Sequence, residues 1–367
     1  MTFARGIADR WRAAVPQAET VATPNPSPLP RLSSRQGGSP WVGLLGIALA
    51  MLLPRTSKAD LTDNLRIAAD ASYRSIYRDA ETEWSHLFAF GFDVHKVFSS
   101  SKGDIGTFVF QPYALRTVNI DPPPPFFDDG ANWGLQWRIA NFNLTALAKN
   151  RFNIRVGHFR VPFGLEHLTP ETQGRLRNYT TIRGFRADWG ATVNGVLPFG
   201  EYEVGWSRGS GNDWDTRGDP YLVSGRIGSP RNKRFVVGAS FQTGDIQLGP
   251  GIVGRTRGGV DMSYFAGPFS VRADFSVGED DDRKRWALLT DFSYLALADT
   301  LDGYTQVFIT STEFGSKWEE TYEMRFGVRW EVHRVAALST ELRQPIEAAP
   351  NRSERPTLFM QLRFRFQ

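Results

Sequence analysis

The chain contains no cysteine and only five histidines among its 367 residues. The absence of cysteine excludes disulfide frameworks, thiolate metal sites and cysteine nucleophiles. The histidines show no metal-ligand spacing on one element, and no zincin motif or glycine-rich phosphate loop occurs. We therefore expect no metal, no cofactor and no enzyme activity.

Long apolar runs are also missing, and the mean hydropathy is −0.34. Each membrane-spanning helix needs about 20 mostly apolar residues, so a helical membrane protein is excluded. A membrane β-barrel is not excluded, because its strands alternate between apolar and polar residues.

Basic charge is scarcer than the net charge of +4 suggests. Residues 1–59 contain six arginines and one lysine against two acids, Asp9 and Glu19. The rest of the chain has 36 lysines and arginines against 37 acids, and only six of these bases are lysines. A nucleic-acid-binding protein needs a basic patch or stripe, so no nucleic-acid partner is expected.

A signal peptide is expected near the N-terminus. Residues 41–53 read WVGLLGIALAMLL, and Arg31 and Arg35 precede them. Ser57 and Ala59 supply small residues at the two positions that a signal peptidase reads. The run is short for a spanning helix, and a buried core helix is the alternative. We predict cleavage after Ala59, with an N-terminal extension and signal peptide over 1–59 and one exported domain over 60–367.

From about residue 65 onward, apolar and polar residues alternate with period two and no long helical pattern occurs. In 356–366, for example, every second residue is large and apolar on one face, and arginines and a glutamine lie on the other. About sixteen such segments can be recognised: 65–77, 84–98, 105–117, 131–148, 151–161, 187–197, 200–208, 219–228, 233–243, 256–266, 268–278, 284–296, 302–312, 320–332, 334–344 and 356–366.

The links between these segments alternate in length. Tight turns are expected at 148–150, 198–200, 229–232, 267–268 and 333–334. Longer links are expected between them, at 118–130, 162–186, 209–218, 244–255, 279–283, 313–318 and 345–355. A transmembrane barrel has short periplasmic turns at one rim and longer outer loops at the other, whereas a soluble sandwich has no reason to sort its loops in this way.

The polar faces of the segments hold bulky charges of both signs at mid-strand. In a soluble sandwich the apolar face is inside and the polar face meets water. A closed barrel can instead satisfy every backbone group within lipid, with its apolar face toward lipid and its charges toward a watery lumen. The sequence therefore predicts an all-β chain that forms a transmembrane antiparallel barrel of about sixteen strands.

Residues 155–166 read RVGHFRVPFGLE, and this strand followed by V-P-F-G-L-E resembles the phosphate-selective porin O/P family of Gram-negative outer membranes. The last strand, LFMQLRFRFQ, is similar to the end of outer-membrane barrels, although Gln367 follows the final aromatic residue. The resemblance implies a sixteen-stranded barrel, usually a homotrimer surrounded by outer-membrane lipid and lipopolysaccharide. It also implies passage of small solutes, sometimes anions or phosphate. Phosphate-selective members have lysine-rich funnels, which this lysine-poor chain lacks.

If the first strand runs outward from the periplasm, 162–186 is the third outer loop. The resemblance implies that this loop folds inward and narrows the pore. Its charged residues, beside His167, form the predicted constriction: Glu166, Glu171, Arg175, Arg177, Arg183 and Arg186. A positive ring in a low-dielectric channel favours anions, and arginine can bind carboxylate or phosphate through paired donors. Solvated loop charges are the alternative.

The expected pore wall adds inward-facing arginines, many of which should pair with carboxylates across strands. These wall residues are Arg138, Arg155, Arg272, Arg325, Arg329 and Arg343. Close pairs such as Glu323 and Arg325 can neutralise each other.

The function favoured by these patterns is passive diffusion of small hydrophilic solutes and ions, either general or mildly anion-preferring. A non-conducting structural or adhesion barrel is one alternative. An outer-membrane enzyme is another, and it needs a serine and a histidine on an outward face near the rim. His86 and His333 are the conceivable bases, but neither has an obvious adjacent serine and acid in the sequence.

Overall fold

The computed structural model describes residues 63–79, 83–101, 103–119, 133–168, 176–181, 186–212, 218–248, 251–315, 317–347 and 355–367. The predicted leader and its cleavage point after Ala59 lie outside these residues. Within the described ranges, no helix is long and apolar enough to cross a membrane.

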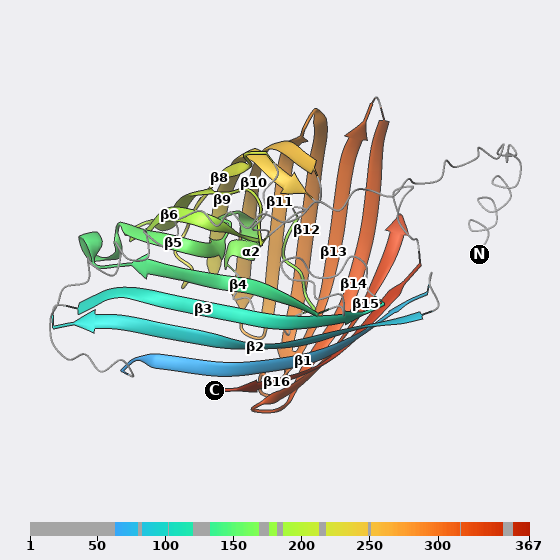
Figure 1. Cartoon of the computed structure of the whole chain (residues 1–367). Helices are drawn as coiled ribbons and strands as arrows, with labels where there is room; N and C mark the ends of the chain where they lie inside the picture. Colours follow the sequence, from blue (N-terminus) through green and yellow to red (C-terminus); the bar gives the residue numbers. More distant parts are fainter. Residues whose placement is uncertain are drawn as a thin grey trace, which may run out of the picture. The chain divides into compact units, whose positions relative to one another are not determined.

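The described residues form sixteen strands in one antiparallel sheet that closes on itself, with β1 paired to β16 (Figure 1). This confirms the predicted all-β barrel. Two short helices, η1 (Leu147–Asn150) and α2 (Gly164–Leu168), interrupt the strand order. The strands are β1 (Leu65–Arg78), β2 (Glu83–Ser100), β3 (Gly103–Val118), β4 (Trp133–Leu144), β5 (Asn153–Arg160), β6 (Ala187–Leu197), β7 (Gly200–Ser207), β8 (Tyr221–Gly228), β9 (Phe235–Leu248), β10 (Gly251–Ala266), β11 (Phe269–Asp280), β12 (Arg283–Ala296), β13 (Leu301–Phe314), β14 (Lys317–His333), β15 (Ala336–Glu347) and β16 (Thr357–Phe366).

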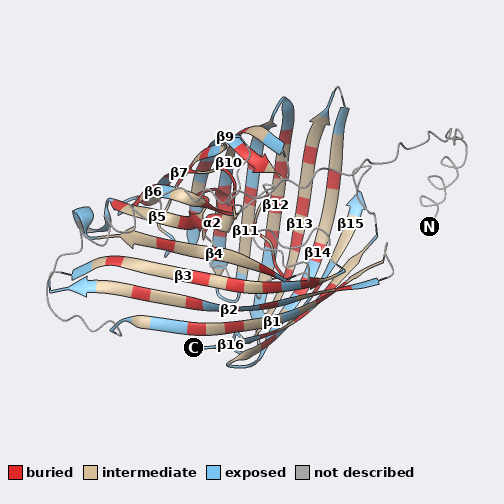
Figure 2. Ribbon diagram, viewed as in Figure 1, coloured by how far each residue is buried: buried red, intermediate tan, exposed pale blue. Residues whose placement is uncertain are grey.

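The two faces of the sheet differ as the alternation predicts. Side chains of successive strand residues point to opposite faces, and burial alternates along the strands in Figure 2. In β15, Glu341 is 0% exposed whereas the adjacent Leu342 is 39% exposed. In β14, Phe326 and Trp330 expose 45% and 47% of their surface. Charged side chains therefore face the inside of the barrel, and large apolar side chains face outward.

Many of the inward charges are paired across strands. Arg226 and Asp261 form an ion pair at 2.7 Å, and Arg363 Nε donates to Asp70 Oδ1 at 2.9 Å. Unpaired burial of a charge is costly, whereas a hydrogen-bonded pair is tolerated. These contacts allow charges to line the inner wall with little exposed surface of their own.

Three links that the sequence predicts to be long are short in the structure, and the tight turn expected at 148–150 is a longer link, 145–152, that contains η1. The expected loops at 244–255, 279–283 and 313–318 are tight hairpins, because the flanking strands continue past the end of the apolar alternation. Gly244 and Arg255 remain paired, for example, and so do Gly251 and Leu248. Backbone pairing does not require an apolar outer face, so it can continue where the alternation stops. The four longest connections, 119–132, 161–186, 208–220 and 348–356, still join strand ends at the same rim.

Candidate functional site

The connection between β5 and β6 returns against the polar face of the sheet. Phe163 packs with Leu222 of β8 and Ile246 of β9, which are 1% and 0% exposed. Leu165 packs with Leu289 of β12, which is also 0% exposed. These apolar contacts hold the described part of the connection against the inner wall.

The V-P-F-G-L-E motif forms the start of α2 at this wall. The first N–H groups of a helix have no partner within the helix, and here wall side chains accept from them. Gly164 N donates to Ser240 Oγ at 3.0 Å, and Leu165 N donates to Asp274 Oδ2 at 2.7 Å. Gly164 has φ +59, and a Cβ atom at this position would overlap Asp274 Oδ2. Glycine is therefore required twice over, by its backbone conformation and by the close approach of the wall.

We expect Gly164→Ala to destabilise the folded barrel by about 1–3 kcal/mol more than Gly267→Ala, which is the cost of overpacking. Gly267 is a matched control, because it has the same φ of +59 but nothing within 4 Å of the added Cβ. The midpoint of urea unfolding, followed by tryptophan fluorescence in detergent, measures the difference. Equal midpoints for the two variants would show that Asp274 does not crowd this turn.

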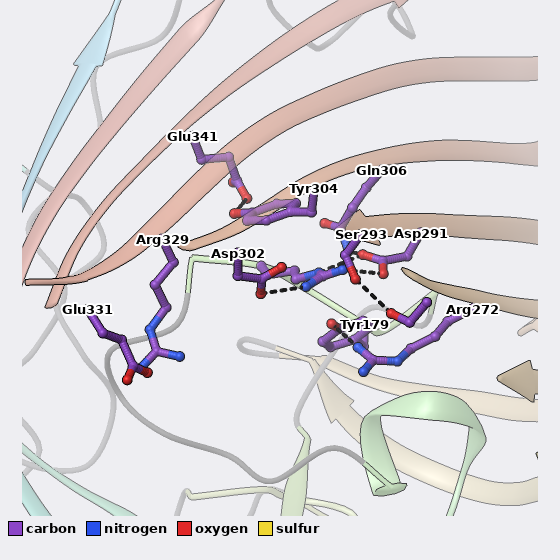
Figure 3. Close-up of polar contacts among 12 residues, drawn as sticks. Tyr179, Arg272, Asp291, Ser293, Asp302, Tyr304, Gln306, Arg329, Glu331 and Glu341 are labelled. Atoms are coloured by element: carbon purple, nitrogen blue, oxygen red, sulfur yellow. Dashed lines mark hydrogen bonds and ion pairs between the residues drawn. The ribbon is translucent and has the colours of Figure 1, made fainter. Parts of the chain in front are cut away.

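Among the described charged residues of the connection, Arg177 makes the most polar contacts with the wall. Its Nε donates to Asp291 Oδ2 at 2.7 Å, and its Nη1 donates to Asp302 Oδ2 at 3.0 Å. The guanidinium lies 4.5 Å from the centre of the Tyr304 ring. Figure 3 shows Asp291, Asp302 and Tyr304 converging from β12 and β13. Burial lowers the pKa of Arg177, but Tyr179 and the two carboxylates raise it above its usual value, so the group stays charged.

Further polar contacts fix the chain around Arg177. Gln306 Nε2 donates to Asp291 Oδ2 and to the carbonyl of Asn178, each at 2.8 Å. Tyr179 accepts a hydrogen bond from Arg272, as Figure 3 shows. Thr181 Oγ1 donates to Asp274 Oδ1 at 2.9 Å. Residues 177–181 are thus attached to the wall from β11 to β13.

His167 lies in α2 beside a second group of wall charges. Its Nε2 accepts from Arg231 Nη2 at 3.3 Å and lies 3.4 Å from Glu203 Oε2. Glu203 is itself paired with Arg155 at 2.6 Å. Burial, with Arg231 and Arg155 nearby, holds the pKa of His167 well below its usual value. His167 is therefore neutral at pH 7 and adds no charge to the site.

The structure describes three of the six predicted constriction residues, and Glu171, Arg175 and Arg183 lie outside the described residues. Arg177 is buried in the contacts above. Arg186 has a 45% exposed side chain, 3.7 Å from Glu166 Oε1. Arg186 also donates through Nη2 to Asn178 Oδ1 at 2.8 Å.

The six predicted wall arginines lie on the polar, inward side of their strands. Arg155 pairs with Glu203 and Arg272 binds Tyr179, as described above. Arg138 is 3% exposed and stacks 5.0 Å from the centre of the Tyr113 ring. These three wall arginines are held by partners on β3, β7 and the connection.

The other three wall arginines come from β14 and β15. Arg325 and Arg343 each bond the glutamate two residues before them, at 2.5 Å and 2.6 Å. Both guanidinium groups also cover a phenylalanine ring, at 3.8 Å and 4.0 Å from its centre. Arg329 pairs at 2.7 Å with Glu331, and both side chains are more than a third exposed.

Five arginines follow one another along the wall from β10 to β1, and we call them the arginine track: Arg257, Arg285, Arg325, Arg343 and Arg74. Arg257 of β10 and Arg285 of β12 both lie opposite Gly278 of β11, and Arg74 Nε donates to Gln361 Oε1 at 3.0 Å. Arg285 and Arg325 line one pocket of about 140 Å³ between residues 178–181 and the wall. Arg325 and Arg343 occupy directly opposed positions on β14 and β15.

Carboxylates beside the arginine track are fewer than its arginines among the described residues. Asp280 contacts Arg257 and also Arg255, the latter at 2.8 Å. Glu323 and Glu341 accompany Arg325 and Arg343. The named arginines of the track therefore outnumber the carboxylates that pair with them, by five to three.

Sequence reasoning missed Asp291 and Asp302, which anchor the connection, and it placed Asp274 on the inner wall without predicting its contact with the connection. Each is an ordinary polar residue on the inward face of a strand, and the alternation identifies only that face. Nothing in the local sequence indicates which of the inward carboxylates the β5–β6 connection reaches.

His86 does have a serine nearby, contrary to the impression from the sequence. Its Nδ1 lies 2.9 Å from Tyr73 Oη and 3.3 Å from Ser75 Oγ on the outward side of β1 and β2. The described contacts of His86 include no carboxylate that would complete a catalytic triad. Among the described residues, no group of three or more histidine or acidic side chains could bind a metal ion.

No protein-family model and no curated protein matches this chain. Solved outer-membrane structures do resemble it, and the alignments with three of them each cover 82% of this chain. OmpF of Salmonella typhi matches over 97% of its own length with 10% identity and a TM-score of 0.60. The anion-selective porin from Comamonas acidovorans matches over 99% with 11% identity and a TM-score of 0.55. OmpT of Vibrio cholerae, in its trimer form, matches over 99% with 10% identity and a TM-score of 0.57.

The fold is that of a porin. At this level of identity the likeness concerns the backbone of the barrel and not the residues of the site. The charges inside the barrel therefore have to be interpreted from their own contacts.

Proposed function

We propose that this chain forms an outer-membrane channel for passive diffusion of small hydrophilic solutes, with a preference for small anions. One observation carries the proposal: the charged face of the sheet is inside the barrel and the apolar face is outside, the opposite of a soluble protein. Glu341 is fully buried inside the barrel and Leu342 is exposed outside it. A closed sheet with this arrangement pairs its backbone groups within lipid and surrounds a polar lumen.

The β5–β6 connection is proposed to narrow this lumen as an inward-folded third outer loop. Support comes from its contacts with inward side chains of β8 to β13. In this proposal Arg186 supplies accessible positive charge, Arg177 fixes the position of the loop, and Glu166 moderates the charge of Arg186. Glu171, Arg175 and Arg183 are proposed to complete the constriction.

The anion preference is proposed to arise from the arginine track together with Arg138, Arg155, Arg272 and Arg329 of the wall. Guanidinium groups stay charged at any physiological pH and match the geometry of carboxylates and phosphates. A positively lined, narrow lumen concentrates anions and excludes cations. Arginine would then take the place of the lysines that are scarce here.

Reversal potentials in planar lipid bilayers test the selectivity. Under a KCl gradient the zero-current potential is expected to shift toward the chloride equilibrium potential. Replacement of chloride by phosphate and then by a dicarboxylate ranks the anions. A shift toward the potassium equilibrium potential would contradict the anion preference and leave a general channel.

We also propose that the chain is a member of the phosphate-selective porin O/P family, because RVGHFRVPFGLE resembles that family. The motif lies where β5 ends and α2 begins. Membership of this family would imply selectivity for phosphate. Phosphate that permeates no better than chloride would argue against that selectivity but not against the proposed channel function.

We further propose that the protein is exported with removal of residues 1–59 and assembles as a homotrimer through β5 to β8. Strands β5, β7 and β8 have eight residues each. Eight residues tilted by about 45° rise about 19 Å, less than the apolar band of about 25 Å in such barrels. A neighbouring subunit would cover the part of this wall that the strands do not span.

Single-cysteine variants test this interface without interference, because the native chain contains no cysteine. Val204→Cys on the outward face of β7 is expected to crosslink subunits with a short bismaleimide. Val260→Cys on the long strand β10 is the control, and it should remain uncrosslinked. The two valines are 44% and 57% exposed in the single chain. Crosslinking at Val260 alone would place the interface elsewhere.

A non-conducting structural barrel and an outer-membrane enzyme are the competing functions. Two pockets of about 140 Å³ and 130 Å³ lie between the β5–β6 connection and the wall, and we take this unfilled space as support for a channel. The Ser75–His86 contact is the observation that bears on an enzyme, and without an acid it does not form a triad.

A further inference from the structure

A groove of about 290 Å³ opens on the outward side of β1 to β4 and β16. Two alanines, Ala71 and Ala114, are among its lining residues. Phe88, Trp133 and Phe364 also line it. Small side chains among large aromatic ones leave an apolar hollow on this outward face.

A positive charge stands beside this groove. Arg116 is exposed on β3, two residues beyond Ala114 and on the same outward side. Its guanidinium lies 5.8 Å from the centre of the Trp133 ring. No described carboxylate pairs with Arg116, in contrast to the many ion pairs on the inner wall. A charge on the lipid-facing side of a barrel is stabilised by a partner of opposite charge.

Three polar side chains lie on the same outward face, two on β1 and one on β2, which separates β1 from β3. Register places Phe88 opposite Arg116 and His86 opposite Val118, so His86 is a diagonal neighbour of Arg116 on the outward face. Tyr73 and Ser75 bond to His86 Nδ1. Hydrogen-bonding groups and a guanidinium thus gather above an apolar groove.

The polar side of the groove points to the rim with the longest connections. β1 ends at Arg78 and β3 ends at Val118, immediately before the connection 119–132. Long connections are on the outer side of such barrels. The arrangement therefore faces the outer leaflet, which in an outer membrane consists of an acylated, phosphorylated glycolipid.

We propose that this groove binds an acyl chain of a phosphorylated outer-leaflet lipid, with Arg116 bound to its phosphate. A guanidinium forms paired, charge-assisted hydrogen bonds to phosphate oxygens, and the aromatic walls contact the chain. No carboxylate is among the residues that line the groove, so a phosphate beside Arg116 would meet no like charge there. The inference rests on the proposed membrane location and not on conductance.

Native mass spectrometry of the full chain in nonionic detergent tests the proposal, with diphosphorylated lipid A and its dephosphorylated form as probes. Arg116→Gln is expected to weaken binding of the phosphorylated probe about tenfold, the effect of about 1.4 kcal/mol. It should leave the dephosphorylated probe unaffected. Ala114→Leu fills the groove and should weaken both probes.

Arg334→Gln is the matched control, because Arg334 is an exposed arginine in the turn at the opposite rim. It should bind both probes like the native chain. Unchanged affinity in both Arg116→Gln and Ala114→Leu overturns the proposal. Loss of oligomers in these variants with unchanged lipid affinity also overturns it, and assigns the groove to a second subunit.

Bilayer conductance of the same samples separates this proposal from the proposed function. A conducting channel without lipid A binding refutes only the lipid site. Lipid A binding by a protein that does not conduct refutes only the channel.

Discussion

Arg177→Met is expected to release the β5–β6 connection from the wall and to give a channel of larger, unsteady conductance. The substitution removes the guanidinium that bonds Asp291 and Asp302. The side chain of Asp291 is 0% exposed, so its charge would remain buried without its main partner. Breaking a buried ion pair in this way costs about 3–5 kcal/mol. Single-channel recording measures both the step size and its fluctuation.

Two further variants test whether the effect of Arg177→Met comes from the loss of its ion pairs. Combining Arg177→Met with Asp291→Asn and Asp302→Asn removes the stranded charges and should restore much of the steady conductance. Arg186→Met removes an exposed arginine of the same connection and should leave the steps regular. If Arg177→Met and Arg186→Met give the same regular steps, Arg177 does not anchor the connection.

Reversing the charges of Arg325 and Arg343 together is expected to lower the anion-to-cation permeability ratio about tenfold, which requires only about 1.4 kcal/mol. Each substitution by glutamate changes the local charge by two, in the middle of the arginine track. The neighbouring Glu323 and Glu341 would then lack their partners and add to the negative potential. The zero-current potential under a KCl gradient gives the ratio. It is best measured at low salt, because the screening length is about 10 Å at 0.1 M salt.

The control for this pair is Arg334→Glu, in the exposed turn that joins the same two strands. This substitution changes the charge at the mouth of the pore, whereas the double reversal changes the charge of the arginine track inside it. It should shift the zero-current potential much less than the double reversal does. A double reversal without effect on selectivity would mean that ions do not pass the arginine track.

The sequence predicts the barrel well because one physical requirement acts on every strand. Outward residues such as Phe326 and Trp330 and inward residues such as Arg325 must alternate wherever the sheet separates two different environments. Near the outer rim that requirement ends, and the alternation fades. The hairpins at 244–255, 279–283 and 313–318 therefore resemble loops in the sequence although their backbones remain paired.

Contacts of the candidate site are harder to predict, because they depend on where a distant segment meets the wall. Arg177 and Asp291 are far apart in sequence, and no local pattern links them. The Ser75–His86 contact is different, since the two residues are directly paired across the β1–β2 hairpin. Its position follows once the turn is known to lie at 79–82, which the sequence alone does not define closely enough.

Stepwise conductance of the purified protein in a planar lipid bilayer tests two claims together: that the apolar face of the sheet lies toward lipid, and that the polar interior is an open lumen. A folded barrel with lipid outside and water inside should insert spontaneously and give discrete, long-lived steps in KCl. A protein that migrates as a folded, heat-modifiable barrel on gels but produces no steps at any concentration would contradict the channel.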